Sequence, residues 1–274
     1  MAVTMADIQH LRKMTGAGMM DCKNALTEAD NDFEKAMEII RKKGQAVAAK
    51  RSDRDASEGC VLAKCNDGFA VIIALKCETD FVAKNADFVA LTNEIIDAAL
   101  AAKCKTLDEV KALPLGKGTV QDAVVDRSGV TGEKMELDGY SIVEGPTTAV
   151  YIHPGNRLAT SVAFNQADVP AEITHEVAMQ IAAMAPVAVD EAGVPADLIA
   201  REKEIAADKA REEGKPENLI ERIAQGRISK FYKEVCLLNQ EYVKDPKKTV
   251  AEYLKSIDKD LTVIAFNRFT LNQE

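Results

Sequence analysis

Residues 59–77 read GCVLAKCNDGFAVIIALKC, and this stretch predicts the class of fold. Two apolar segments, 59–65 and 69–77, flank Asn66-Asp67-Gly68, which is the pattern of two strands joined by a hairpin turn. The larger side chains of the second segment alternate onto one face: Phe69, Val71, Ile73, Leu75 and Cys77. The opposite face is also apolar, so we expect it to be partly covered as well.

A helix and a further strand follow this hairpin. Phe88, Leu91, Ile95 and Ala99 recur at helical spacing, residues 118–126 have the pattern of a short helix, and residues 135–143 that of a strand.

The same order then returns later in the chain. Residues 147–152 and 157–164 form a second hairpin pattern around the turn 153–156, and a strand is expected at 261–271. A helical stripe lies between them: Ile173, Val177 and Ile181. Two such units predict an α+β fold with two similar subdomains side by side, each with an antiparallel sheet. The expected subdomains are these: 56–144 for the first, and 145–186 with 241–274 for the second.

The N-terminal residues have a different, helical pattern. Thr4 and Asp7 resemble a capping box, and the break at 15–18 separates a first helix from a second. Asp30-Asn31 is expected to cap a third helix, with Gly44 just past its end. Three short helices predict a small bundle, so we assign residues 1–55 to a helical domain whose last part is a linker.

An insertion at 187–240 separates the second helical stripe from the last strand. Charged helices are predicted at 196–213 and 217–233, joined by the helix-breaking Gly214-Lys215-Pro216. One apolar stripe follows the second helix: Ile220, Ile223, Ala224, Ile228 and Phe231. This pattern predicts a projecting helical hairpin, and its narrow seam is also suited to association with a second copy.

The composition narrows the classes of function. The chain has 274 residues, a net charge of -9 and an isoelectric point near 5.1, so we expect no direct binding of nucleic acid. It contains no apolar run of about 18 residues, and residues 1–10 lack the pattern of a secretory signal, so we expect no membrane contact. Six cysteines without a C-x-x-C pair are typical of reduced thiols in a cytoplasmic protein.

The residues that carry chemistry form no recognisable constellation. None of the three histidines lies four positions from another, and no Cys/His cluster has the spacing of zinc ligands. A phosphate-binding loop and the G-x-S-x-G signature of a nucleophile are both missing. We therefore expect a binding protein without a cofactor or metal of its own, and not an enzyme.

Two short segments are candidates for partner contacts. Thr79 can cap a helical turn and Val82 can pack inward, but Asp80-Phe81 in the same loop has two interpretations. Phe81 covers the edge of the core, which residue type alone slightly favours, or it is an aromatic anchor for a partner. Met19 and Met20 are adjacent, so both cannot face one helical core, and an exposed methionine suits adaptable contacts.

The order of these motifs resembles a known family. Residues 15–26 (TGAGMMDCKNAL) and 77–84 (CETDFVAK) are similar to two signatures of the elongation factor Ts family. Tyr151-Ile152-His153, Gly214-Lys215-Pro216 and residues 246–250 (PKKTV) match further along the chain. Two departures are a Pro154-Gly155-Asn156 turn where glycine-rich versions are usual, and Thr131 where many members carry an apolar contact.

The resemblance implies a fold and a function. It implies an N-terminal domain like the ubiquitin-associated domain, a two-part core, and a hairpin that dimerises through Ile220, Ile223 and Ile228. It also implies exchange of guanine nucleotide on elongation factor Tu, the expected partner.

Individual residues acquire roles from the same resemblance. Within the segment Thr79-Asp80-Phe81-Val82, Phe81 would wedge into an apolar pocket of the GTPase while Asp80 disturbs the partner's magnesium. Met19 and Met20 would contact a helix of the GTPase, and His153 would add a contact from the core.

Two other classes of function compete with exchange. An interaction scaffold would bind through residues 1–55 and would not need Phe81. A thiol enzyme would need at least one cysteine of low pKa.

Overall fold

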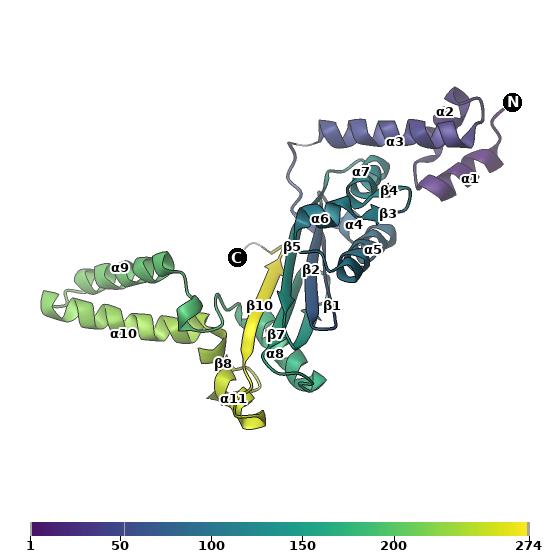
Figure 1. Cartoon of the computed structure of the whole chain (residues 1–274). Coiled ribbons are helices and arrows are strands. Elements are labelled where there is room, and N and C mark those ends of the chain that lie inside the picture. The colour runs from purple at the N-terminus through teal and green to yellow at the C-terminus, as the bar shows by residue number, and fades with distance from the viewer. Residues whose placement is uncertain (1, 52, 273–274) are drawn as a thin grey trace.

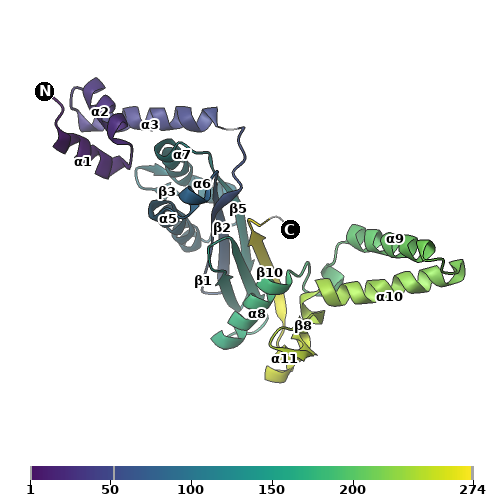
Figure 2. The same cartoon turned by 180° about the vertical axis from the view of Figure 1, so that it is seen from behind.

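The computed structural model describes residues 2–51 and 53–272, so positions 1, 52, 273 and 274 of the expected domains lie outside the described residues. Figure 1 shows a central body of strands with the N-terminal helices at one end and a helical hairpin projecting from the side near the other. Figure 2 shows the same arrangement from behind. Among the described residues, none of the helices is both long and apolar enough to cross a membrane.

The hairpin expected from the sequence is present. Strand β1 (Glu58–Asn66) pairs antiparallel with β2 (Phe69–Cys77) up to their adjacent ends, so only Asp67 and Gly68 form the turn. Their φ angles are 47° and 72°, and two positive values in a two-residue turn match the twist of a hairpin.

The first sheet is completed and covered by elements that follow the hairpin. β5 (Met135–Glu144) pairs antiparallel with β2, giving the order β1-β2-β5. Helix α5 (Ala86–Ala102) packs on one face of the sheet, where Phe88 and Ile95 are fully buried. Between α5 and β5 lie four short elements: α6 (Leu107–Ala112), β3 (Pro114–Leu115), β4 (Gly118–Thr119) and α7 (Val120–Thr131).

The second sheet has the same composition of elements. β6 (Thr147–Ile152) and β7 (Leu158–Phe164) form its hairpin, and β10 (Val263–Thr270) pairs with the other edge of β7. Helix α8 (Ala171–Met184) packs on the outer face of this sheet. Three further elements follow the insertion: β8 (Glu241–Tyr242), β9 (Asp245–Thr249) and α11 (Val250–Ile257).

A buried carboxylate joins these last elements to α8. Glu176 accepts hydrogen bonds from the hydroxyls of Tyr242 at 2.6 Å and Tyr253 at 2.5 Å, and from Lys244 at 2.5 Å. Burial opposes ionisation, but these three donors outweigh it and lower the pKa of Glu176 to about 2.

The two sheets pack face to face through apolar side chains, several of them alanines. Ala63, Ile72 and Ala74 of the first sheet meet Ala159 of the second. Because the opposite face of β2 is covered by α5, both faces of this strand are buried, as the apolar pattern of residues 69–77 predicts. The described core is therefore a helix–sheet–sheet–helix stack, which confirms the α+β class with antiparallel sheets.

Residues 2–51 contain three helices. They are α1 (Met5–Thr15), α2 (Met19–Glu28) and α3 (Phe33–Lys50). The capping box of Thr4 and Asp7 is present, with Thr4 N donating to the Asp7 carboxylate at 2.9 Å.

Two expectations for α3 are wrong. Its cap is Asp32, whose carboxylate accepts from the amides of Glu34 and Lys35, whereas Asp30 and Asn31 have positive φ and form the turn before it. The helix also continues past Gly44 to Lys50, through part of the stretch expected to be a linker.

Gly44 lies inside α3, where α3 crosses α7, and not at a helix end. A Cβ added to Gly44 would lie 3.2 Å from the Cα of Gly129 in α7, and a Cβ added to Gly129 would lie 2.1 Å from the Cα of Gly44. Only glycine at both positions lets the two backbones approach this closely. The crossing attaches the N-terminal helices to the core.

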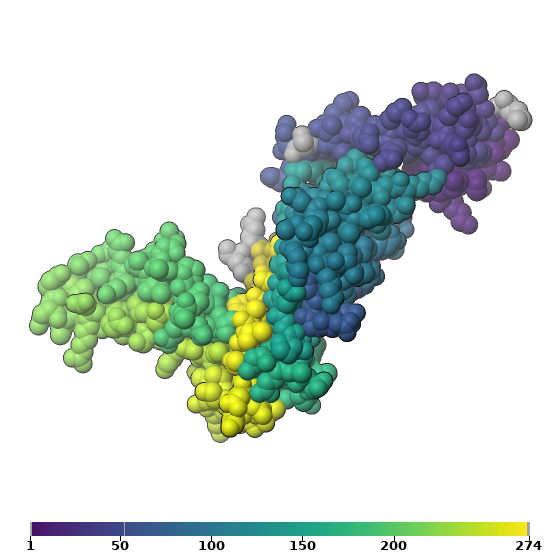
Figure 3. Space-filling view, viewed as in Figure 1, coloured from purple at the N-terminus to yellow at the C-terminus, as the bar shows by residue number. Residues whose placement is uncertain are grey.

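The insertion folds as the expected hairpin. α9 (Ala196–Glu212) and α10 (Glu217–Val235) are antiparallel, and Gly214 between them has a φ of 73°. In the space-filling view, the hairpin and the N-terminal helices project from the core and leave an open space between them (Figure 3). Two 3-10 turns, Glu191–Gly193 and Leu237–Asn239, flank its base.

Candidate functional site

The segment that follows β2 presents an aromatic side chain to solvent. Residues Asp80–Ala83 form the one-turn helix α4, capped by the Thr79 hydroxyl, which accepts from the amide of Val82 at 3.4 Å. Asn85 then caps α5 by accepting from the amide of Asp87 at 2.9 Å.

Phe81 and Val82 separate on this turn. Val82 packs against the first core, whereas the side chain of Phe81 is 84% exposed. The interpretation in which Phe81 covers the edge of the core is therefore wrong, because the single turn points the ring away from it.

Asp80 is held by a neighbouring cation that the sequence interpretation missed. Lys84 Nζ lies 2.6 Å from Asp80 Oδ2, and this hydrogen bond lowers the pKa of Asp80 below its usual range. The spacing of four residues on a helical segment was a usable signal for this pair. The Lys84 side chain is 78% exposed and the Asp80 side chain is 49% exposed, so the Asp80 carboxylate is accessible to another cation.

One carboxylate from a distant part of the chain binds the segment's backbone, and one carboxylate of the segment binds the backbone beyond α7; both contacts were missed. Glu133 accepts from the amides of Glu78 at 3.2 Å and Thr79 at 3.0 Å, and from the Thr79 hydroxyl at 2.6 Å. Glu78 accepts from the amide of Lys134 at 2.6 Å. No local pattern indicates these contacts, because more than fifty residues separate the partners.

Met19 and Met20 begin α2. Met20 is 63% exposed, while Met19 is half-buried against the core of the N-terminal helices. One of the two therefore reaches solvent, as their adjacency predicts.

His153 lies in the turn after β6, on the surface. Its Nδ1 is 3.1 Å from the hydroxyl of Tyr151, and the Tyr151 ring also meets His175 edge-on at 5.7 Å. The hydroxyl and the ring of Tyr151 therefore orient the His153 ring.

The three expected residues of the hairpin differ in exposure. Ile220 and Ile228 are 4% and 2% exposed, buried in the seam between α9 and α10. Ile223 is 37% exposed and lines a shallow groove together with Ile205. Of the three, only Ile223 is accessible to another molecule in this conformation.

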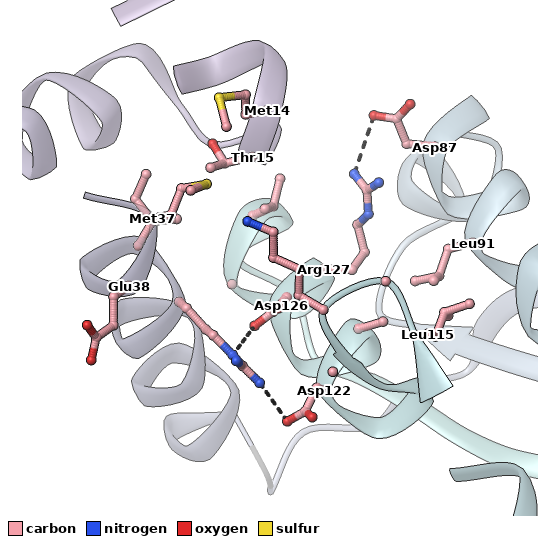
Figure 4. Close-up of a pocket in the computed structure, with 18 of the residues that line it drawn as sticks. Met14, Thr15, Met37, Glu38, Asp87, Leu91, Leu115, Asp122, Asp126 and Arg127 are labelled. Atoms are coloured by element: carbon pink, nitrogen blue, oxygen red, sulfur yellow. Dashed lines mark hydrogen bonds and ion pairs between the residues drawn. The ribbon is translucent and has the colours of Figure 1, made fainter. Parts of the chain in front are cut away.

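A cleft of about 860 Å³ lies between the N-terminal helices and the core, and the sequence did not indicate it (Figure 4). Met14 and Met37 line one side of it, and Leu91 and Leu115 line the other. None of the candidate partner-binding residues lines this cleft.

Several of the charged residues that line the cleft form ion pairs. Arg41 of α3 lies 2.9 Å from Asp122 and 3.6 Å from Asp126 of α7, and Arg127 lies 3.3 Å from Asp87. Burial raises the pKa of Asp126, and Arg41 only partly opposes this. The Arg41 pairs link α3 to α7, and the Arg127 pair links α7 to α5 within the core. Over the described ranges 2–51 and 53–272, no group of three His, Cys, Asp or Glu side chains is arranged to hold a metal.

Comparison with known proteins shows the family of the chain. A family model described as Elongation factor TS matches residues 78–273. Elongation factor Ts of Porphyromonas gingivalis is 60% identical over 275 aligned positions, with 100% of both chains covered. The Elongation factor Ts proteins of Bacteroides thetaiotaomicron and Parabacteroides distasonis are 56% and 55% identical, again with full coverage of both chains. The chain belongs to the elongation factor Ts family.

Proposed function

We propose that this chain is a guanine nucleotide exchange factor that binds elongation factor Tu carrying GDP and promotes release of the GDP during translation elongation. Membership of the elongation factor Ts family supports the role in elongation. The observation that carries the proposal is the exposure of Phe81, at 84%, on a capped turn beside Asp80. A rigidly held aromatic with this exposure is suited to filling an apolar pocket of a partner.

Exchange of this kind needs no general acid, base or nucleophile. It needs a complex in which the factor and GDP each weaken the other's binding to the GTPase, by the same factor in both directions. Burial of Phe81 in the partner would supply about 1.5–3 kcal/mol, and each 1.4 kcal/mol shifts an equilibrium about tenfold. Loss of the partner's magnesium would remove the cation that neutralises the phosphates of GDP.

Asp80 can take part in this step because its present partner is weakly held. Solvent screens an exposed pair of this kind and leaves it a small contribution to stability, so Asp80 can leave Lys84 at little cost. In the complex, the carboxylate would then compete for the magnesium or for its ligands.

Further contacts belong to the same proposal. Met20, with Met19 behind it, would meet a helix of the GTPase, and His153 would contact it from the core. Ile223 would support association of two copies through the hairpin, since Ile220 and Ile228 are buried. We place the activity in the cytoplasm, with no direct contact to nucleic acid or membrane.

Release of a fluorescent GDP from purified elongation factor Tu, chased with unlabelled GDP, tests the proposal. The full chain is expected to accelerate release, and Phe81→Ala to reduce that acceleration about 10-fold to 150-fold. The melting temperature should not change, because the ring packs on little else. Ile257→Ala removes an apolar side chain that is 47% exposed in α11 and serves as the matched control.

Two results would count against the proposal in different ways. If the folded chain does not accelerate release at all, the exchange function is wrong. If Phe81→Ala accelerates release as well as the wild-type chain does, exchange stands but the wedge does not.

A further inference from the structure

The backbone of the segment that carries Phe81 is fixed by a carboxylate from a distant part of the chain. Glu133 accepts hydrogen bonds from the amides of Glu78 and Thr79 and also from the Thr79 hydroxyl, whose oxygen lies 2.6 Å from Glu133 Oε1. Hydrogen bonds to an ionised carboxylate are stronger than those between neutral groups. The Thr79 hydroxyl uses its one O–H as the donor to Glu133. Its oxygen lone pairs remain available to accept a hydrogen bond from the amide of Val82.

Glu133 is itself held in place by the end of α7. Gly132 ends that helix with a φ of 72°, and its amide donates to the carbonyl of Ser128 at 2.9 Å. The Ser128 hydroxyl donates to the carbonyl of Glu133 at 2.5 Å, and the Glu133 amide donates to the Thr131 hydroxyl at 3.3 Å. The carboxylate therefore extends from a rigid helix end and not from a loose loop.

A second carboxylate links the same segment to the N-terminal helices. Glu78 accepts from Arg51 at 2.9 Å and from Arg54 at 3.0 Å, just beyond the end of α3, and from the amide of Lys134 at 2.6 Å. Its side chain is 13% exposed. Since α3 crosses α7 at Gly44 and Gly129, the segment, the end of α7 and the end of α3 form one connected unit.

The Phe81 ring has little packing of its own to set its direction. A helix of four residues has no independent stability, so without its cap α4 would be held only by the packing of Val82 and Ala83, and the direction of Phe81 would vary. A partner would then have to order the turn on binding, which lowers affinity.

We propose that Glu133 is a positioning residue, which holds the Thr79 cap so that Phe81 is presented in its binding orientation before the partner arrives. This inference rests on the proposed exchange function. Glu133 itself touches neither the GTPase nor the nucleotide in this scheme.

The test compares Glu133→Ala and Glu133→Gln with Glu136→Gln in the full chain. Glu136 is a nearby carboxylate on β5 that pairs with the Lys134 ammonium at 3.4 Å, and none of the contacts of the Phe81 segment described above involves it. Amide hydrogen exchange of the free protein is expected to speed up at least tenfold at Thr79 and Val82 in Glu133→Ala. The amides of β2 should keep their protection, and Glu136→Gln should behave as wild type.

Release of GDP from elongation factor Tu gives the second readout. In Glu133→Ala, the concentration for half-maximal acceleration is expected to rise at least tenfold, with an intermediate value for Glu133→Gln, which keeps one acceptor oxygen. Thr79→Ala should add little to Glu133→Ala, because the two act through one contact.

The outcomes separate the inference from the function on which it rests. If the wild-type chain does not accelerate release, the proposed function fails, while hydrogen exchange still decides whether Glu133 orders the segment. If wild type accelerates release and both Glu133 variants match it in amide exchange, the inference is overturned. If Glu133→Ala does not fold, Glu133→Gln is the deciding variant. Slower release of GDP with unchanged protection of the Thr79 and Val82 amides would then also overturn the inference.

Discussion

Gly129→Ala adds one methyl group at the point where α7 crosses α3. The new carbon would lie 2.1 Å from the Cα of Gly44, and a backbone atom cannot turn aside as a flexible side chain can. To reach ordinary contact at 3.4 Å, the helices must separate by roughly 1.3 Å. That movement would also stretch the contact of Arg41 with Asp122, now 2.9 Å.

Two opposing terms set the size of the effect. Alanine is favoured over glycine inside a helix by about 0.8–1 kcal/mol, whereas overpacking against a backbone atom 2.1 Å away lies in the upper part of its usual range, at about 2–3 kcal/mol. We expect Gly129→Ala to lower the free energy of unfolding by about 1–2 kcal/mol. Gly226→Ala is the matched control, because Gly226 is inside α10 and an added Cβ would meet nothing within 4 Å. It should raise the free energy of unfolding by about 0.8–1 kcal/mol.

Urea unfolding and thermal melting followed by circular dichroism measure this difference. For a chain of this size, 1 kcal/mol corresponds to about 2–4 °C, so the two variants should melt roughly 4–12 °C apart, on opposite sides of wild type. Amide exchange of α3 would show whether the loss is local to the crossing. Equal stabilisation by Gly129→Ala and Gly226→Ala would refute the close contact of the two helices.

Glu176→Gln should lower the free energy of unfolding by about 1–3 kcal/mol at pH 7, because three donors lose a charged acceptor. Since the folded pKa of about 2 lies below the ordinary 4.5, urea unfolding should show this difference above pH 4.5 and its decline as the pH falls toward 2. Cys65 is exposed and the other five cysteines are buried, so a thiol reagent should modify Cys65 first in the native protein and all six in urea, although burial raises the pKa of the Cys65 thiol and slows its reaction; native modification of several cysteines at the rate of Cys65 would contradict this. Ile220→Ala should destabilise the chain by about 2–5 kcal/mol, and Ile223→Ala by less. If the hairpin associates, analytical ultracentrifugation should show weaker association in Ile223→Ala.

Elements with local signals could be predicted from the sequence. Asp67-Gly68 supplies the two positive φ angles that a tight hairpin needs, so the turn and both strands follow from neighbouring residues. Thr4 with Asp7 likewise marks the start of α1. The same type of signal was present at Thr106 with Glu109, which cap α6, but the helix was not predicted because it is only six residues long.

Features that depend on distant partners could not be predicted in this way. Gly44 followed by a charged, alanine-rich stretch has the local pattern of a helix end, and only the position of Gly129 explains why the helix continues. The sequence around Glu133 resembles that of any surface glutamate, because the backbone amide that its carboxylate binds lies 54 residues earlier. The exposure of Phe81 was also undecided, because residue type alone favours burial and the direction of a single turn decides otherwise.

β7 is the middle strand of its sheet, yet one of its neighbours, β10, is encoded about 100 residues later. At a synthesis rate of about 5–20 residues per second, β6 and β7 leave the ribosome roughly 5–20 s before the strand that completes their sheet. The α9–α10 hairpin can form during this interval, because its contacts are local. Until β10 arrives, the open edge of β7 can pair with another nascent chain, so the growing chain is most prone to aggregate in the interval between the emergence of β7 and that of β10.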